Sequence, residues 1–271
     1  MPHRLCYAAE EVQQERIDIL LEIQRIGADG LVLDYCRQIP ILMYHSALVE
    51  SFMAKHGTDP RQIQSRNPDD FRSWFQYRAD VLTGFMQRLR QAVQEQTLGS
   101  PCPIIPRVPD NTPWLMIAYG LDIGRWCTED LIDGLMLSPF LLCRDDPGHY
   151  HAYHVKVAHR HNKICIGGLG SKKLIESRVQ QNTGFFHPQP VYDWTDKQYQ
   201  SGVDAVSLYQ SETMVRMDYL KETVTAIGDR QLVAQRATGL PAADYPICMD
   251  WHTHLPVPHS IDVTQVGNAA L

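Results

Sequence analysis

Long hydrophobic runs are absent from this sequence. No apolar stretch reaches the roughly 20 residues of a membrane-spanning helix, and the first residues show no signal-peptide core. No Gly-x-Gly-x-x-Gly pattern follows a predicted strand, which removes the main support for a dinucleotide-binding sheet. Basic residues are outnumbered, with 25 Lys and Arg against 31 Asp and Glu for a net charge of -6. Nucleic-acid and anionic-membrane surfaces need a basic excess, so we expect neither partner.

The cysteines lack the spacing of a metal site. There are 7, an odd number, and no two are separated as Cys-x-x-Cys. Several lie in apolar segments, where a free thiol packs as a small hydrophobic group. We therefore predict reduced, mostly buried thiols, no zinc site built from them and no cofactor. Reduced thiols indicate a cytoplasmic location, or secretion if the chain is a fragment whose signal lies upstream.

A seven-residue pattern occurs three times. Each copy has an Asp near its start, then a short apolar segment, then a polar residue at its end. The copies are 28–34, 132–138 and 203–209. In a parallel α/β sheet such segments are strands, and their variable ends form a site at one edge. The ending residues would face that site, whereas the leading Asp29, Asp133 and Asp204 would shape the turns into the strands.

Strand and helix patterns alternate along the chain. Apolar segments predict strands at 30–33, 103–108, 132–137, 163–166 and 203–209. Apolar residues at helical spacing predict helices at 10–26, 68–98, 122–130, 151–161, 195–201 and 212–227. The prolines after residue 240 predict an extended tail, with short strands at 231–234 and 246–249, and 189–192 reads as a loop. The order predicts an α/β fold with a parallel sheet, and we favour a (β/α)8 TIM-type barrel over an open doubly wound sheet.

Residues 27–37 resemble the fourth strand of glycosyl-hydrolase-like barrels, close to glycoside hydrolase family 10. There a helix leads into an Asp-Gly-x-x-x-Asp-Tyr-x-Arg element, and here 16–18 lead into 29–37. Other parts of 4–228 are similar to that family: 48–52, 56–60, Trp74, Arg78, 119–126, 131–134 and 201–205. The resemblance implies a partial barrel over 1–228, holding strands four to eight, and a tail over 229–271. Either an N-terminal segment is missing or a homo-oligomer completes the barrel.

The same resemblance implies a protein that hydrolyses or binds a carbohydrate. Barrel sites lie at the carboxyl ends of strands, where Asp34 is the expected catalytic carboxylate. Hydrolysis normally needs a second carboxylate, for which Glu212 is the best candidate and Asp110 and Asp122 are weaker ones. The expected substrate-binding residues are Tyr35, Arg37, Arg107, Ser138 and Tyr209.

Aromatic residues also suit a sugar site, because flat rings match the apolar faces of sugars. Several lie in or near the predicted loops above the sheet: Tyr35, Tyr44, Trp114, Trp194 and Tyr209. For each of them, filling the core is the alternative role.

Two other functions stay open. If the chain has no second catalytic carboxylate, it fits a barrel that binds carbohydrate without catalysis. Alternatively, His252 and His254 follow an apolar segment as in the first metal-binding strand of amidohydrolase barrels, although too few residues follow them for the remaining strands. A further histidine cluster reads as a polar helix face rather than as a metal site: His149, His151, His154, His159 and His161.

Overall fold

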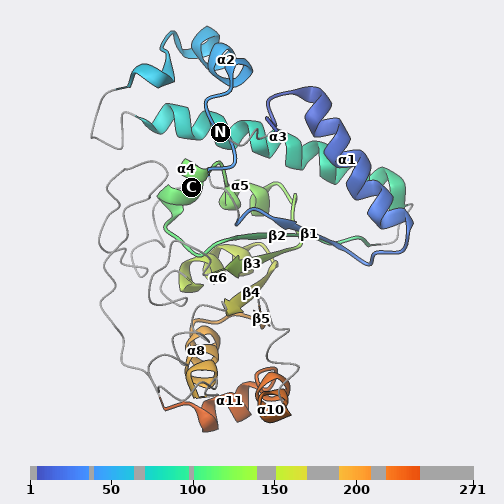
Figure 1. Cartoon of the computed structure of the whole chain (residues 1–271), viewed down its shortest axis with the longest axis vertical. Coiled ribbons are helices and arrows are strands. Elements are labelled where there is room, and N and C mark those ends of the chain that lie inside the picture. Colours follow the sequence, from blue (N-terminus) through green and yellow to red (C-terminus); the bar gives the residue numbers. More distant parts are fainter. Residues whose placement is uncertain are drawn as a thin grey trace. The chain divides into compact units, whose positions relative to one another are not determined.

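A computed structural model of the 271-residue chain describes residues 5–36, 40–63, 71–97, 101–138, 151–169, 189–208 and 218–238 (Figure 1). Within these ranges one sheet has the strand order β1-β2-β3-β4-β5. Its strands are β1 (Leu31–Asp34), β2 (Ile104–Pro109), β3 (Gly134–Ser138), β4 (Ile164–Leu169) and β5 (Ala205–Leu208). Strands β2 to β5 pair in parallel, and helices separate successive strands. The predicted α/β class is confirmed, and the arrangement is that of a partial (β/α) barrel.

The chain divides into two compact units, and strand β2 contributes to both. Among the described residues, the first unit takes those up to Pro106 and those from Thr112 to Asp133. It contains α1 (Glu10–Arg25), α2 (Ser46–His56), the short 3-10 helix η1 (Pro60–Gln62), α3 (Arg72–Thr97), α4 (Pro113–Tyr119) and α5 (Ile123–Thr128). The second unit takes 107–111 and the described residues from Gly134 onward. It contains α6 (His151–Arg160), α8 (Gln189–Gln200), α10 (Asp218–Ala226) and α11 (Arg230–Arg236).

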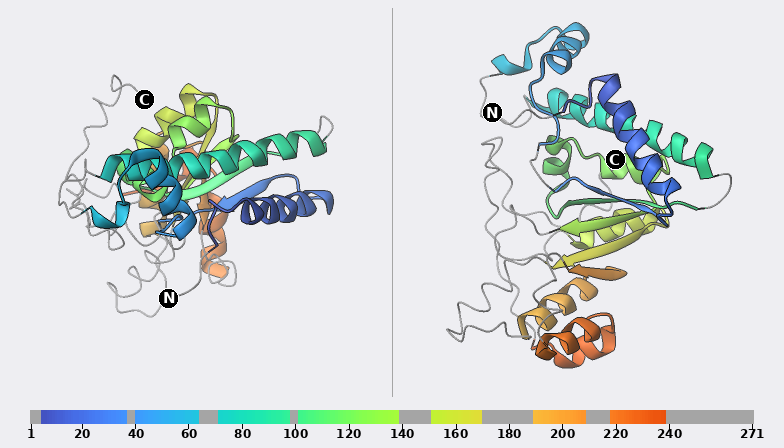
Figure 2. Two further views of the ribbon diagram at one scale, coloured as in Figure 1. Left: turned by 90° about the horizontal axis from the view of Figure 1, so that it is seen from above. Right: turned by 45° about the vertical axis from the view of Figure 1, so that its right-hand side comes forward.

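Helix α3 is the longest described helix of the first unit. Its apolar face, including Trp74, Leu82 and Leu89, is fully buried, as the helical spacing predicts. Helix α1 lies beside it (Figure 2), and Arg88 of α3 donates to Gln13 of α1 at 3.0 Å. None of the helices in the described ranges has the length and apolar character needed to traverse a bilayer.

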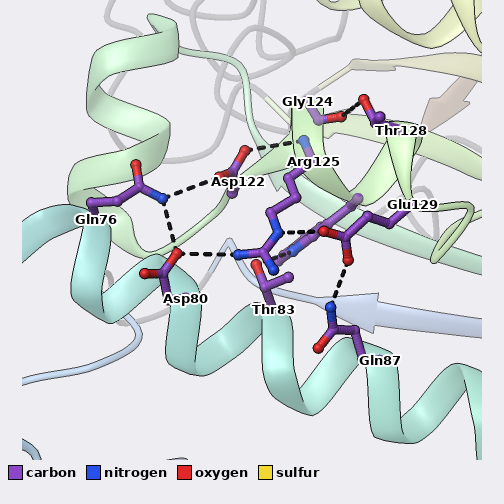
Figure 3. Close-up of polar contacts among 10 residues, drawn as sticks. Gln76, Asp80, Thr83, Gln87, Asp122, Gly124, Arg125, Thr128 and Glu129 are labelled. Atoms are coloured by element: carbon purple, nitrogen blue, oxygen red, sulfur yellow. Dashed lines mark hydrogen bonds and ion pairs between the residues drawn. The ribbon is translucent and has the colours of Figure 1, made fainter.

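Polar side chains join α3 to α5 (Figure 3). The Arg125 guanidinium contacts Asp80 at 3.2 Å and Glu129 at 2.6 Å, and Gln87 donates to Glu129 at 2.6 Å. Asp122 caps α5 by accepting the backbone N–H of Arg125 at 3.1 Å. Asp122 therefore has a structural task at the start of α5.

The repeated aspartate before a strand fastens that strand to its neighbour. The Asp133 carboxylate accepts the backbone N–H of Ile104 at 2.7 Å, while the Asp133 N–H donates to the Ile104 carbonyl at 2.9 Å. Asp204 and Cys165 repeat this exchange at 2.7 Å and 2.8 Å. Each pair satisfies backbone groups where two parallel strands begin. The structural role predicted for Asp133 and Asp204 is confirmed, and that of Asp29 stays a prediction.

The sequence did not predict helices α2, η1, α4 and α11. Helix α4 begins at an N-cap, Thr112, whose hydroxyl accepts the N–H of Leu115 at 3.1 Å, with Pro113 as its first residue. Helix α2 ends at Gly57, whose positive φ of 71° suits a helix terminus. The predicted loop at 189–192 is wrong, because these residues form the first turn of α8, where a proline is tolerated.

The predicted strand at 231–234 is also wrong. These residues lie in α11, which begins where the Asp229 side chain accepts the N–H groups of Gln231 and Leu232 at 2.9 Å and 3.0 Å. The helix packs against α8, with Val233 in a cluster that includes Trp194. An extended tail therefore does not begin at 229, and the predicted strand at 246–249 lies outside the described residues.

Candidate functional site

Asp34 is the last residue of strand β1, and it is exposed. Its Oδ1 accepts the backbone N–H of Cys36 at 2.9 Å, so the turn that follows the strand orients the carboxylate. The sequence places Asp34 at a strand end, and the structure has it there. An exposed carboxylate at this position is accessible to a dissolved ligand, and its catalytic role stays a prediction.

Tyr35 follows Asp34 but belongs to the core. Only 5% of it is exposed, its hydroxyl donates to the sulfur of Met86 at 3.4 Å, and its ring lies 5.8 Å from that of Trp126. This burial raises the pKa of Tyr35 well above its ordinary value, so the phenol is neutral. Tyr35 therefore fills the core, which was the alternative role for each aromatic residue, and its substrate-binding role stays a prediction. Successive side chains of an extended chain point to opposite sides, which directs Asp34 outward and Tyr35 inward.

Arg107 and Ser138, both expected to bind substrate, meet in the second unit. Strands β2 and β3 are in register as Arg107 with Met136 and Pro109 with Ser138. This register lets the Arg107 guanidinium donate to the Ser138 hydroxyl at 2.6 Å. Both residues are buried, with 7% and 2% exposed. The structure thus brings two sequence-predicted residues together and places a cation at the carboxyl ends of two parallel strands.

Asp110 and His151 form a fully buried pair beside these residues. Asp110 follows β2 directly, and its N–H donates to the Ser138 carbonyl at 3.0 Å. Its carboxylate lies 2.7 Å from Nδ1 of His151, and neither side chain is exposed. The two atoms are close, but they are not aligned as a hydrogen bond. Arg107, Ser138, Asp110 and His151 together make a compact polar group at the end of β2 and β3.

His154 extends this polar group by one helical turn. Its Nε2 lies 2.9 Å from the Asn111 carbonyl, and the residue is buried. Burial lowers the pKa of His154 below its ordinary value of 6.5, an effect that the nearby Asp110 charge opposes. His154 is therefore neutral at pH 7. Among the described residues, neither His151 Nε2 nor His154 Nδ1 has a hydrogen-bond partner.

The interpretation of the histidine cluster as a polar helix face is wrong for His151 and His154. Both lie on the buried face of α6, whereas His159 points outward and contacts Asp204 at 2.8 Å. Histidines three apart share one face of a helix, and here that face packs against β3 and β4. The missed signal was this spacing together with the polar run that begins at Asp110.

Several predicted residues lie outside the described ranges, and their roles stay predictions: Arg37, Tyr209, Glu212, His149, His252 and His254. The described residues contain no group of three or more His, Cys, Asp or Glu side chains placed to hold a metal ion.

The fold is similar to that of a solved glycoside hydrolase. The chain matches the PgaB (BpsB) glycoside hydrolase domain from Bordetella bronchiseptica with a TM-score of 0.60 and 14% sequence identity. The match covers 84% of this chain and 64% of that chain, so this chain spans less than two thirds of its structural neighbour. No protein-family model matches the sequence, and no curated protein matches it significantly. At this identity the likeness concerns the fold, and it supports a glycosyl-hydrolase-like fold without specifying family 10.

Proposed function

We propose that the chain is a carbohydrate-active protein that hydrolyses glycosidic bonds, with Asp34 as a catalytic carboxylate. The observation that carries this proposal is the likeness of 84% of the chain to a glycoside hydrolase domain. Barrel enzymes place their catalytic groups at the carboxyl ends of strands, and Asp34 occupies such an end. An exposed carboxylate held by a backbone N–H is suited to act as nucleophile or as general base.

The second carboxylate in this proposal is Glu212, as the sequence suggests. Two-carboxylate hydrolysis needs one acid that protonates the leaving oxygen and one carboxylate that attacks the sugar carbon or activates water. Asp110 is poorly suited to either task, because it is fully buried against His151. We assign the Asp110–His151 pair to positioning, since the Asp110 N–H donates to the carbonyl of Ser138, which together with Arg107 is a proposed contact to substrate oxygens.

The test is hydrolysis of neutral polysaccharides, namely hydroxyethyl cellulose, xylan, laminarin and glycol chitin, followed by the release of reducing ends. We expect cleavage of at least one of them by the wild-type protein. Asp34→Asn should lower the rate by a factor of about 100 or more, because loss of a positioned acid or base costs roughly 100- to 10,000-fold. Asp18→Asn is the matched control, since Asp18 is exposed on α1 and contacts Gln14.

Three outcomes would contradict the proposal in different ways. Full activity of Asp34→Asn would remove Asp34 from the chemistry. Equal loss in Asp18→Asn would point to a general effect on the fold. Retention of a polysaccharide without any cleavage would favour the alternative of a carbohydrate-binding barrel without catalysis.

A further inference from the structure

Tyr44 differs from the other aromatic residues that the sequence suggests for a sugar site. Of these residues in the described ranges, Tyr35 and Trp194 are buried and Trp114 is half-buried. Tyr44 is 42% exposed. It belongs to the segment between β1 and α2, and Asp34 is the last residue of β1. A single exposed aromatic residue is ordinary on a protein surface, so exposure alone assigns no role.

The Tyr44 ring is the open end of a stack of aromatic rings. It lies on the ring of Trp74 at 5.2 Å between centroids and 23° between planes. Trp74 lies in turn on Tyr77 at 6.3 Å and 17°, and it is fully buried. The Lys55 ammonium lies 5.6 Å from the centroid of the Tyr77 ring. Trp74 thus stacks on one face of the Tyr44 ring, and 42% of Tyr44 stays exposed.

The backbone around Tyr44 is held on both sides. The Leu42 carbonyl accepts a hydrogen bond from the buried Arg78 guanidinium at 2.9 Å, and the Ile41 N–H donates to the Tyr119 carbonyl at 3.2 Å. On the other side, the His45 carbonyl accepts the N–H of Val49 at 2.9 Å in the first turn of α2. A ring fixed by its neighbours before binding loses little conformational entropy when a ligand stacks on it.

We propose that the exposed face of Tyr44 is a stacking platform for a pyranose ring of the carbohydrate. The C–H groups on one face of a pyranose form a flat apolar surface that matches an aromatic ring, while its hydroxyls stay in water. This inference rests on the proposed function, because it names a binding subsite for the same substrate class. It places that subsite in the segment that follows β1, the strand whose last residue is Asp34.

The test measures retention of the protein in native gels that contain hydroxyethyl cellulose, xylan, laminarin or glycol chitin. These polymers are neutral, so the net charge of -6 does not drive retention. We expect Tyr44→Ala to weaken binding of the retained polymer by about fivefold to tenfold, the size of one ring-stacking contact. Tyr44→Trp keeps a flat ring and should bind within about twofold of wild type.

Met53→Ala is the matched control, because Met53 is 39% exposed on neighbouring α2 and is not part of the stack. Circular dichroism of each variant checks that the fold is kept. The stacking platform is refuted if Tyr44→Ala binds the polymer as tightly as wild type does. It is also refuted if Met53→Ala loses as much binding as Tyr44→Ala, or if no polymer retains the wild-type protein.

The failure of this inference is distinguishable from that of the proposed function. Cleavage that depends on Asp34 but not on Tyr44, with KM unchanged in Tyr44→Ala, would contradict the stacking platform and support the proposed hydrolase. Retention that depends on Tyr44, in a protein that cleaves none of the polymers, would support the stacking platform and contradict the proposed hydrolase.

Discussion

Aspartates of this chain have different roles because their surroundings differ. Asp34 is exposed at a strand end, Asp110 is buried against a histidine, and Asp204 joins the starts of two strands. Partial burial by itself raises the pKa of Asp204, but hydrogen bonds from the Cys165 N–H and His159 outweigh it and lower the pKa below its ordinary value of 3.8. The folded state therefore favours the charged form of Asp204.

Replacing Asp204 with asparagine should make the free energy of unfolding depend less on pH in the acid range. A group with a lowered folded-state pKa stabilises the fold above its unfolded-state pKa, and this contribution is lost as the pH falls through the folded-state value. We expect Asp204→Asn to be less stable than wild type at about pH 6, with the difference shrinking at about pH 3. Urea unfolding at both pH values measures this. The same deficit at both pH values would show that the charge of Asp204 contributes nothing.

Among the elements, strand β4 and helix α8 fit closely at a glycine. Gln198 of α8 is fully buried, and its side-chain amide donates to the Gly168 carbonyl at 3.0 Å. A Cβ atom added at Gly167 would lie 2.0 Å from Oε1 of Gln198, far inside van der Waals contact. Gly167 of β4, which offers no catalytic group, therefore has a packing role.

Gly167→Ala should destabilise the protein by about 1–3 kcal/mol, the usual cost of inserting a methyl group into a packed core. Chemical denaturation measures the change in the free energy of unfolding. Gly84→Ala is the matched control, because nothing lies within 4 Å of a Cβ there. Gly84 is inside α3, so alanine should stabilise the protein by about 0.5–1 kcal/mol.

The double variant Gly167→Ala with Gln198→Ala separates this clash from other effects. If the clash with Gln198 causes the loss, the second substitution should cost less in the Gly167→Ala background than in wild type. Equal costs in the two backgrounds would mean that the two residues do not interact. In that case another neighbour, such as Val203, would account for the loss.

At the scale of the whole molecule, the state of the cysteines decides whether crosslinks contribute to stability. The described cysteines are free thiols, and all except Cys6 are buried. Desolvation raises the pKa values of Cys6 and Cys102, which keeps these thiols protonated and slow to react. These features match the prediction of reduced thiols from the odd cysteine count.

A reducing agent should therefore leave the Tm unchanged. Loss of a native disulfide typically costs about 2–5 kcal/mol, which would lower the Tm of a chain of this size by several degrees. Thermal unfolding with and without dithiothreitol tests this directly. A drop of about 5 °C or more in dithiothreitol would reveal a disulfide and overturn the prediction of reduced thiols for the whole chain.

The periodic segments of this chain could be predicted because their signals are local. Helix α3 follows from apolar residues at helical spacing, and strand β3 from a short apolar run after an Asp. The structural role of Asp133 and Asp204 also followed from their position before a strand. Helix α2, helix α4 and the first turn of α8 were missed, because prolines and weak periodicity hid caps such as Thr112.

The sequence alone determines the five strands of the sheet and the position of Asp34 at a strand end, since backbone preferences and apolar patterns act over a few residues. Packing in three dimensions sets which side chains are buried. Tyr35 turns into the core while Tyr44 stays exposed, and His151 meets Asp110 while His159 faces solvent. Burial depends on contacts between residues far apart in the chain, and no local pattern encodes those contacts.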